Sequence, residues 1–166
     1  MLDRLGPLGF RNIGKTIALF DRLNTVALIR IGGKRSQPGR IHHILCFRHS
    51  FLRDNLDQKV PTKVSLQPSD YPYKFLPSHL METSETSWRY RPLNLNYEYD
   101  TIEWAAQRPE AIHAGLKRLS ILIAQRFVPW AQALTPTLAT AQIQRYGENA
   151  WCERMWLEDY SRFALQ

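Results

Sequence analysis

The segment Arg40–Phe51 constrains the fold of this chain most strongly, because its residues alternate between two faces over its whole length. Ile41, Leu45 and Phe47 fall on one face, and Ile44 and Cys46 fall on the other. A period of two is typical of a β-strand, and large apolar residues on both faces indicate a strand inside a sheet. We therefore expect helices to cover one face of this sheet and the other face to be partly covered.

Two further strands are expected just before this segment. Thr16–Leu23 and Thr25–Ile31 alternate or run apolar, and the residues Asp21–Asn24 favour a turn between them. The polar loop Gly32–Gly39 then leads into the Arg40 strand, which gives a three-stranded antiparallel meander. The tip of this loop carries the basic residues Lys34, Arg35 and Arg40. This pattern is typical of a cluster that contacts phosphate and also of an ordinary solvated hairpin.

The stretch 53–87 is irregular and contains four prolines. A long excursion of this kind in a compact domain is typical of a binding loop or of disorder. We expect Tyr71 and Tyr73 to pack the excursion onto the body of the domain and to stand near a contact surface. The chain then returns in a predicted strand, Trp88–Tyr99, in which Arg89 and Arg91 alternate with aromatic residues as a basic and aromatic strip.

From Asp100 onward the apolar residues recur at helical spacing. A short helix from Asp100 is predicted to stop at Pro109, and Glu110–Phe127 has the clearest amphipathic stripe. Thr135 and Gly147 fit the cap and the stop of the next helix. The last helix is predicted to begin near Glu148, with Trp151, Met155 and Phe163 on one side, Trp156 and Tyr160 in the core, and Glu153, Glu158 and Asp159 outside.

These elements predict an α+β fold, an antiparallel meander sheet of about four strands backed by C-terminal helices. The chain has 166 residues, of which 44% are hydrophobic, which suits one domain with a full core. We expect a single domain over 1–166, with a strand-rich part at 16–99 and a helical part at 100–166.

The segment Gly9–Thr16 fits the P-loop spacing G-x-x-x-x-G-K-T. A working P-loop joins a buried strand to the N-terminus of a helix, where backbone amides and the lysine hold phosphates. Here Gly-Pro precedes the motif and predicted strands follow it. We interpret the match as chance, and it is the only support for a nucleotide-binding enzyme.

No catalytic, metal or cofactor site is predicted. His42 and His43 point to opposite faces of a strand, while His42 and Cys46 share a face but are ~13 Å apart, too far for one zinc ion. No nucleophile and base stand at a usable spacing. Cys46 and Cys152 are expected to be buried reduced thiols.

The formal net charge of +7 lies in the front part of the chain. Residues 1–96 carry fifteen Lys and Arg against seven Asp and Glu, whereas residues 97–166 carry seven against eight. A basic surface attracts nucleic acid, an anionic membrane or an acidic protein. No apolar run approaches the ~20 residues that span a bilayer, and no signal peptide is visible, so we expect a cytoplasmic protein.

The order of meander, excursion, returning strand and helices, with the motif L-x-x-L-G-F-R-x-x-G-x-T at Leu5–Thr16, resembles a family of small bacterial proteins found beside polymorphic toxins. The resemblance implies a sheet backed by helices and the role of an immunity protein that binds and blocks a cognate toxin. A basic binder suits a toxin with an acidic patch. The predicted contact residues are Lys34, Arg35, Arg40, Tyr71, Tyr73, Arg89 and Arg91.

An alternative hypothesis is a nucleic-acid-binding domain. It uses the same basic strip, with the rings of Trp88 and Tyr90 as stacking surfaces for bases. It differs from the first hypothesis in predicting salt-sensitive binding to RNA or single-stranded DNA of any sequence.

Overall fold

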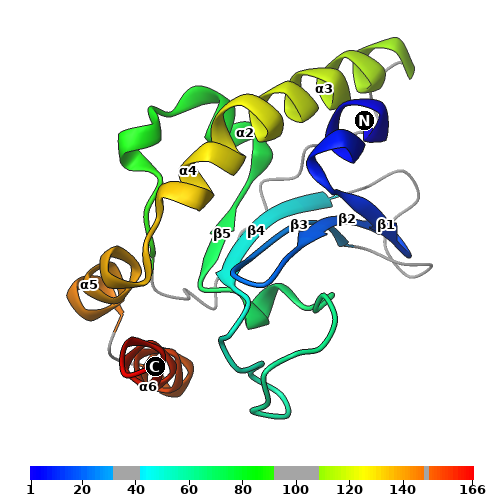
Figure 1. Ribbon diagram of the computed structural model, residues 1–166. Helices are drawn as coiled ribbons and strands as arrows, with labels where there is room; N and C mark the ends of the chain where they lie inside the picture. Colours follow the sequence, from blue (N-terminus) through cyan, green and yellow to red (C-terminus); the bar gives the residue numbers. More distant parts are fainter. Residues whose placement is uncertain (32–41, 92–108, 148–149) are drawn as a thin grey trace.

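The computed structural model describes residues 1–31, 42–91, 109–147 and 150–166, and it confirms the α+β class (Figure 1). Within these ranges one antiparallel sheet has five strands in the order of the sequence. The sheet therefore has one strand more than the four that the sequence predicts, and it is a simple meander. The strands are β1 (Arg11–Ile13), β2 (Thr16–Phe20), β3 (Asn24–Ile31), β4 (His42–His49) and β5 (Tyr73–Phe75).

The central pair of strands is β3 and β4, which run antiparallel from Asn24 opposite His49 to Ile31 opposite His42. The turn between β2 and β3 is held by the Asp21 carboxylate, which accepts hydrogen bonds from the backbone N–H of Leu23 (2.8 Å) and of Asn24 (2.7 Å). Such local capping is why an Asp favours a turn at this place. The predicted meander is thus confirmed for its three strands.

The P-loop interpretation of Gly9–Thr16 is excluded by the local fold. Ile13 pairs with Thr16 across a two-residue hairpin turn made by Gly14 and Lys15, and Gly14 has φ of 61°. Glycine adopts this left-handed conformation without strain, which explains its presence in the turn. β2 and not a helix follows Thr16, so this segment does not lead into a helix N-terminus as a P-loop does.

The strand next to β4 comes from the irregular stretch and not from Trp88–Tyr99. β5 pairs Tyr73 with Phe47 and Phe75 with Leu45. Residues 88–91 are not in a strand, and residues 92–99 lie outside the described part of the chain. The predicted returning strand is therefore wrong for its described portion.

Helices α3 (Pro109–Leu122) and α4 (Val128–Ala133) lie over one face of the sheet (Figure 1). A π-helical turn, Ile123–Phe127, joins them, so the helix predicted to end at Phe127 continues to Ala133. Pro129 has no N–H for an ordinary helical hydrogen bond, and a π-turn just before it accommodates this loss. None of the helices in the described ranges is long and apolar enough to cross a membrane. The remaining short helical segments are α1 (Leu2–Leu5), η1 (Gly6–Leu8), η2 (Pro68–Asp70), α2 (Pro77–Glu82) and η3 (Glu85–Ser87).

The last two helices are α5 (Pro136–Tyr146) and α6 (Trp151–Ala164). The Thr135 cap is confirmed, since its side chain accepts a hydrogen bond from Leu138 N–H, and the helix stops at Gly147. α6 begins later than predicted, and its predicted faces are only partly right. Trp156 and Tyr160 are buried as expected, but Trp151 is exposed, and Glu153 and Asp159 are buried although the spacing predicted them outside.

The main core lies between the sheet and the helices. Val26, Leu28, Leu45 and Phe47 point into it from β3 and β4 and pack with residues of α3 to α6. The opposite face of the sheet carries a smaller cluster with Ala27, Ile29, Ile44, Cys46 and Tyr71. Both faces of β4 are thus buried, as its sequence predicts, and the second face is covered in part by the loop between β4 and β5.

Candidate binding loop

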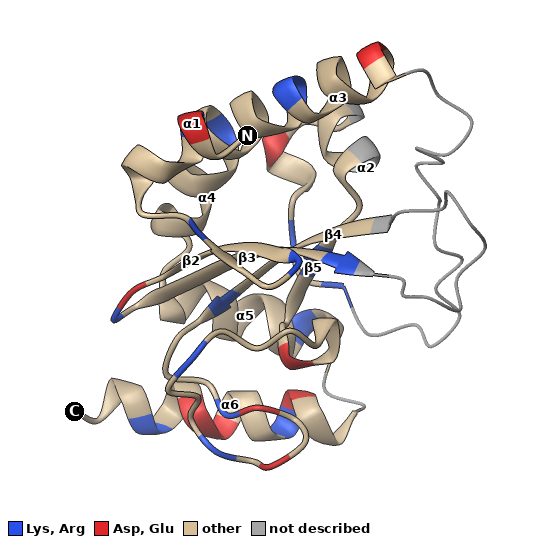
Figure 2. Cartoon of the chain, turned by 90° about the vertical axis from the view of Figure 1, so that its right-hand side faces the viewer, with Lys and Arg blue, Asp and Glu red and all other residues tan. Residues whose placement is uncertain are grey.

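The connection from β4 to β5, residues 50–72, is the longest irregular segment that the structure describes, and we call it the anchored loop. It lies on the side of the sheet opposite α3 and α4 (Figure 1) and carries residues of both charge signs (Figure 2). The sequence left open whether this stretch is ordered. The contacts that Arg48 makes with its residues show that both ends of the loop are held in place.

Arg48 is a charged residue on the inner strand β4, and only 1% of its side chain is exposed. It stands on the face that also carries Ile44 and Cys46, where an unpaired guanidinium group is strongly unfavourable. The strands of the described sheet carry no acidic residue that could pair with it. Its partners must come from elsewhere, and the anchored loop supplies them.

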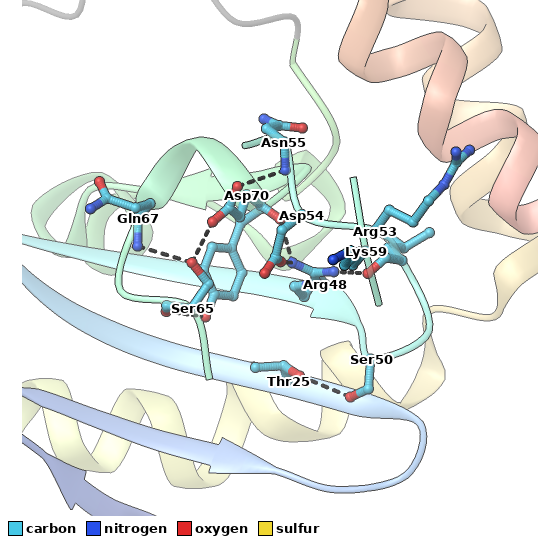
Figure 3. A network of polar contacts seen from close by, with 12 residues as sticks. Thr25, Arg48, Ser50, Arg53, Asp54, Asn55, Lys59, Ser65, Gln67 and Asp70 are labelled. Atoms are coloured by element: carbon cyan, nitrogen blue, oxygen red, sulfur yellow. Dashed lines mark hydrogen bonds and ion pairs between the residues drawn. The ribbon is translucent and has the colours of Figure 1, made fainter. Parts of the chain in front are cut away.

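The Arg48 guanidinium group binds both ends of the anchored loop (Figure 3). On the first end, Nη1 donates to the Asp54 carboxylate and Nη2 donates to the backbone carbonyl of Leu52. On the second end, Nη1 donates to the carbonyl of Asp70 at 3.0 Å, and the guanidinium carbon lies 5.8 Å from the centroid of the Tyr71 ring. One buried cation therefore closes a loop of more than twenty residues.

A second set of hydrogen bonds, centred on the buried Asp70 carboxylate, holds the loop from inside (Figure 3). Asp70 accepts from the backbone N–H of Asn55 at 2.8 Å and from the Ser65 hydroxyl. The Tyr71 hydroxyl donates to the carbonyl of Ser65 at 2.8 Å, and Gln67 N–H donates to Ser65 Oγ at 3.1 Å. These bonds link the start, the middle and the end of the loop.

Burial has an electrostatic consequence for Asp54. Removal from water raises the pKa of its carboxyl group, and the neighbouring Arg48 guanidinium opposes that rise. The ion pair thus stabilises a carboxylate that the loop partly shields from solvent, with 18% of the Asp54 side chain exposed.

The start of the loop is also fastened to α6 through Arg53. The Asp159 carboxylate accepts from the backbone N–H of Arg53 (2.9 Å) and from its Nε (2.6 Å), and Glu158 accepts from Nη2 (2.8 Å). This arrangement explains why Asp159 is buried, contrary to the helical spacing. The carboxylate and Arg53 are 106 residues apart in sequence.

The anchored loop exposes three large apolar side chains. Leu56 is 91% exposed, Val60 54% and Leu66 48%, and Lys59 and Lys63 are exposed between them. Scattered single apolar residues on a surface are ordinary, but here three of them belong to one loop whose base is held by Arg48. The anchored loop is therefore a candidate contact surface.

The structure separates the residues predicted to contact a partner into three groups. Lys34, Arg35 and Arg40 lie outside the described residues. Arg89 and Arg91 are exposed. Tyr71 and Tyr73 are buried in the two cores, which corrects their predicted place on a contact surface, because their rings are held by packing and hydrogen bonds.

The aromatic part of the predicted strip is buried as well. The rings of Trp88 and Tyr90 pack into the main core, so they offer no stacking surface for a base. The sequence reasoning did not single out the exposed apolar residues of the anchored loop. The signal for them was the presence of Leu56, Val60 and Leu66 within a Pro-rich polar stretch.

Two titratable groups, the Lys74 amine and the Cys46 thiol, are buried on neighbouring strands. Lys74 on β5 stands opposite Cys46 on β4, and its Nζ is buried with no hydrogen-bond partner among the residues that the structure describes. Burial lowers the pKa of Lys74 to about 8 and raises the pKa of the Cys46 thiol. A buried thiol with a raised pKa is a poor nucleophile, and both cysteines are free, as expected.

No group of three or more His, Cys, Asp and Glu residues within the described ranges could hold a metal ion. Comparison with known proteins adds no assignment. No protein-family model, curated protein or solved structure matches the chain.

Proposed function

We propose that this protein is a non-enzymatic binding protein, an immunity protein that binds a cognate bacterial toxin in the cytoplasm and neutralises it by occlusion. The observation that carries the proposal is the anchored loop. A buried arginine holds its base, while Leu56, Val60 and Leu66 are exposed to solvent. The resemblance of Leu5–Thr16 to proteins encoded beside toxins supplies the class of partner.

A rigid loop with exposed apolar side chains suits protein recognition for a thermodynamic reason. Binding to a protein surface loses affinity when a loop must first be ordered, and the Arg48 network has already ordered this one. Apolar side chains that leave water and fill pockets of a partner contribute favourably to binding. Lys59 and Lys63, together with the net charge of +7, favour a toxin surface with an acidic patch around those pockets.

Coexpression with the product of the neighbouring gene tests this proposal. We expect the chain to form a stable complex with that product and to protect the cell from it. The double variant Leu56→Asp/Val60→Asp places two charges where apolar contacts are proposed, so it should lose both complex and protection. Leu138→Asp on α5 is the matched control, since Leu138 is 53% exposed, close to the 54% of Val60.

The result is interpretable only if the variants fold, which circular dichroism and thermal unfolding verify. Leu138→Asp should retain complex formation and protection. An absence of complex and protection for the unmodified chain would remove the proposal, and so would full protection by the folded Leu56→Asp/Val60→Asp variant.

A further inference from the structure

A second exposed feature lies at the end of α5, where two arginines stand against one tyrosine ring. The guanidinium carbon of Arg89 lies 5.3 Å from the centroid of the Tyr146 ring, and that of Arg145 lies 5.1 Å from it. Both arginines are exposed and Tyr146 is half-buried. We infer that Arg89, Arg145 and Tyr146 form a recognition site for the carboxylates of an acidic protein segment.

The fold holds the two arginines together although they are far apart in sequence. The backbone N–H of Tyr90, next to Arg89, donates to the side-chain oxygen of Gln142 on α5 at 3.0 Å. Gly147 passes so close to the Tyr90 ring that a Cβ there would lie 2.3 Å from it. The backbone of residues 89 and 90 is therefore fixed against the end of α5, which places Arg89 beside Tyr146.

The two positive charges are close to each other and lack a described acidic partner. Since both guanidinium carbons lie near the same ring centroid, they are no more than about 10 Å apart. Among the residues that the structure describes, no carboxylate forms an ion pair with either arginine. Like charges at this separation repel, and an anion that binds both of them relieves the repulsion.

The Tyr146 ring favours carboxylate binding because it holds both guanidinium groups in place. A guanidinium group that lies over an aromatic face is attracted to the ring, and its N–H donors that do not face the ring can bind a carboxylate in bidentate fashion. Neighbouring carboxylates on one face of an acidic helix are about 5–6 Å apart at Cβ, a spacing within the upper limit of about 10 Å on the separation of the two guanidinium carbons.

The observations favour a protein over a nucleic acid as the ligand. Single-stranded nucleic acid is held by exposed aromatic rings on which bases stack, and here Trp88 and Tyr90 are buried while Tyr146 already contacts guanidinium groups. Duplex binding relies on neutralising several phosphates along a track, whereas this site has two arginines with exposed Arg91 nearby in sequence. The inference rests on the proposed function for the nature of the partner.

Fluorescence anisotropy with a labelled deca-glutamate peptide and the full chain tests the site. We expect measurable binding at low salt that weakens as salt rises. The double variant Arg89→Ala/Arg145→Ala should lose at least tenfold in affinity. The matched control, Arg22→Ala/Arg154→Ala, removes the same charge from exposed arginines outside the site and should lose less than threefold.

A second pair of variants separates geometry from charge and protects against misfolding. Arg89→Lys/Arg145→Lys keeps the charge at the end of α5, and Tyr146→Leu keeps both arginines but removes the ring. Each should lose affinity by several-fold while remaining folded by circular dichroism. An equal affinity for these variants and the unmodified chain would refute the role of the stacked arginines.

Other outcomes also refute the inference. Absence of peptide binding at low salt, or equal losses in the Arg89/Arg145 and Arg22/Arg154 variants, would show that no carboxylate site exists here. Tighter binding of a labelled ten-nucleotide single-stranded DNA than of the peptide would assign the site to nucleic acid instead. If the neighbouring gene product is still captured through Leu56 and Val60, only this inference fails and the proposed function stands.

Discussion

Replacement of Arg48 by methionine is the strongest test of how the anchored loop is held. Methionine keeps an unbranched apolar stem of similar length but removes the guanidinium group. The Asp54 carboxylate loses its ion pair, and the carbonyls of Leu52 and Asp70 lose their donors. Removing one member of a buried pair typically destabilises a protein by about 3–5 kcal/mol. Because the Asp54 side chain is 18% exposed and can recover some hydration, we expect the lower end, about 3 kcal/mol.

Urea unfolding at neutral pH measures this loss, and amide hydrogen exchange shows where it acts. A domain with a total stability of about 5–15 kcal/mol tolerates the change, so the variant should fold and its unfolding midpoint should fall. Exchange should accelerate first at Asn55 and Gln58, whose N–H groups donate to Asp70 and Asp54 within the loop. Arg154→Met on the exposed face of α6 is the control and should change stability by less than about 0.5 kcal/mol.

A double-mutant cycle with Asp54→Asn isolates the pair itself. If the two side chains stabilise each other, the double variant should be more stable than the sum of the single losses implies, by about 1 kcal/mol or more. A loss below about 1 kcal/mol for Arg48→Met, together with unchanged exchange in residues 50–72, would refute the idea that Arg48 anchors the loop.

Three further predictions follow from buried groups. Lys74→Met should stabilise the protein at pH 7 by up to about 3 kcal/mol, because the pKa of Lys74 is lowered from 10.5 to about 8; urea unfolding should show this gain shrinking between pH 8 and pH 10.5, because there the folded chain has released the Lys74 proton while the unfolded chain still holds it, and a gain independent of pH would contradict the cause. Burial lowers the pKa of His49 from 6.5 to about 4, so the unfolded chain binds the proton first and stability should fall by about 3 kcal/mol as the pH drops from 6.5 to 4; His49→Gln should flatten this part of the profile, and an unaltered profile would count against it. Gly147→Ala should lower stability by about 1–3 kcal/mol, since the new Cβ meets the Tyr90 ring at 2.3 Å and the Glu153 carboxylate at 2.6 Å, and an unchanged thermal midpoint would show that these neighbours yield freely.

The parts of the fold that were predictable depend on residues close together in sequence. The alternation in β4 follows from a period of two, and the turn at Asp21 follows from its own side chain. The limits of α5 follow from Thr135 and Gly147 at its ends. Each of these signals acts within a few residues, so the sequence alone carries it.

The errors arise where partners are distant in sequence. Glu153 is buried because it accepts from the Tyr90 hydroxyl, 63 residues away, and from the N–H of Ala150. Asp159 is buried because of Arg53. Helical periodicity predicts that such carboxylates are exposed, because it takes account of their charge but not of hydrogen-bond partners that are distant in sequence.

The β5 strand and the anchored loop were missed for related reasons. Three residues between prolines, Tyr73–Phe75, have too short a pattern to be recognised, and they form a strand because β4 offers an unpaired edge. Arg48 was placed correctly on a face of β4, but its partners in the anchored loop are invisible to spacing rules. The exposed arginines Arg89 and Arg91 could be predicted because charged residues outside such networks stay at the surface.

The most direct measurement of the anchored loop as a binding surface is a tagged pull-down from the native cell after nuclease treatment, with bound polypeptides identified by mass spectrometry. We predict that the unmodified chain and Leu138→Asp capture the product of the neighbouring gene in stoichiometric amount and that Leu56→Asp/Val60→Asp does not. Equal capture by all three folded proteins, or no stoichiometric protein partner for any of them, would contradict the proposal that the anchored loop binds a toxin.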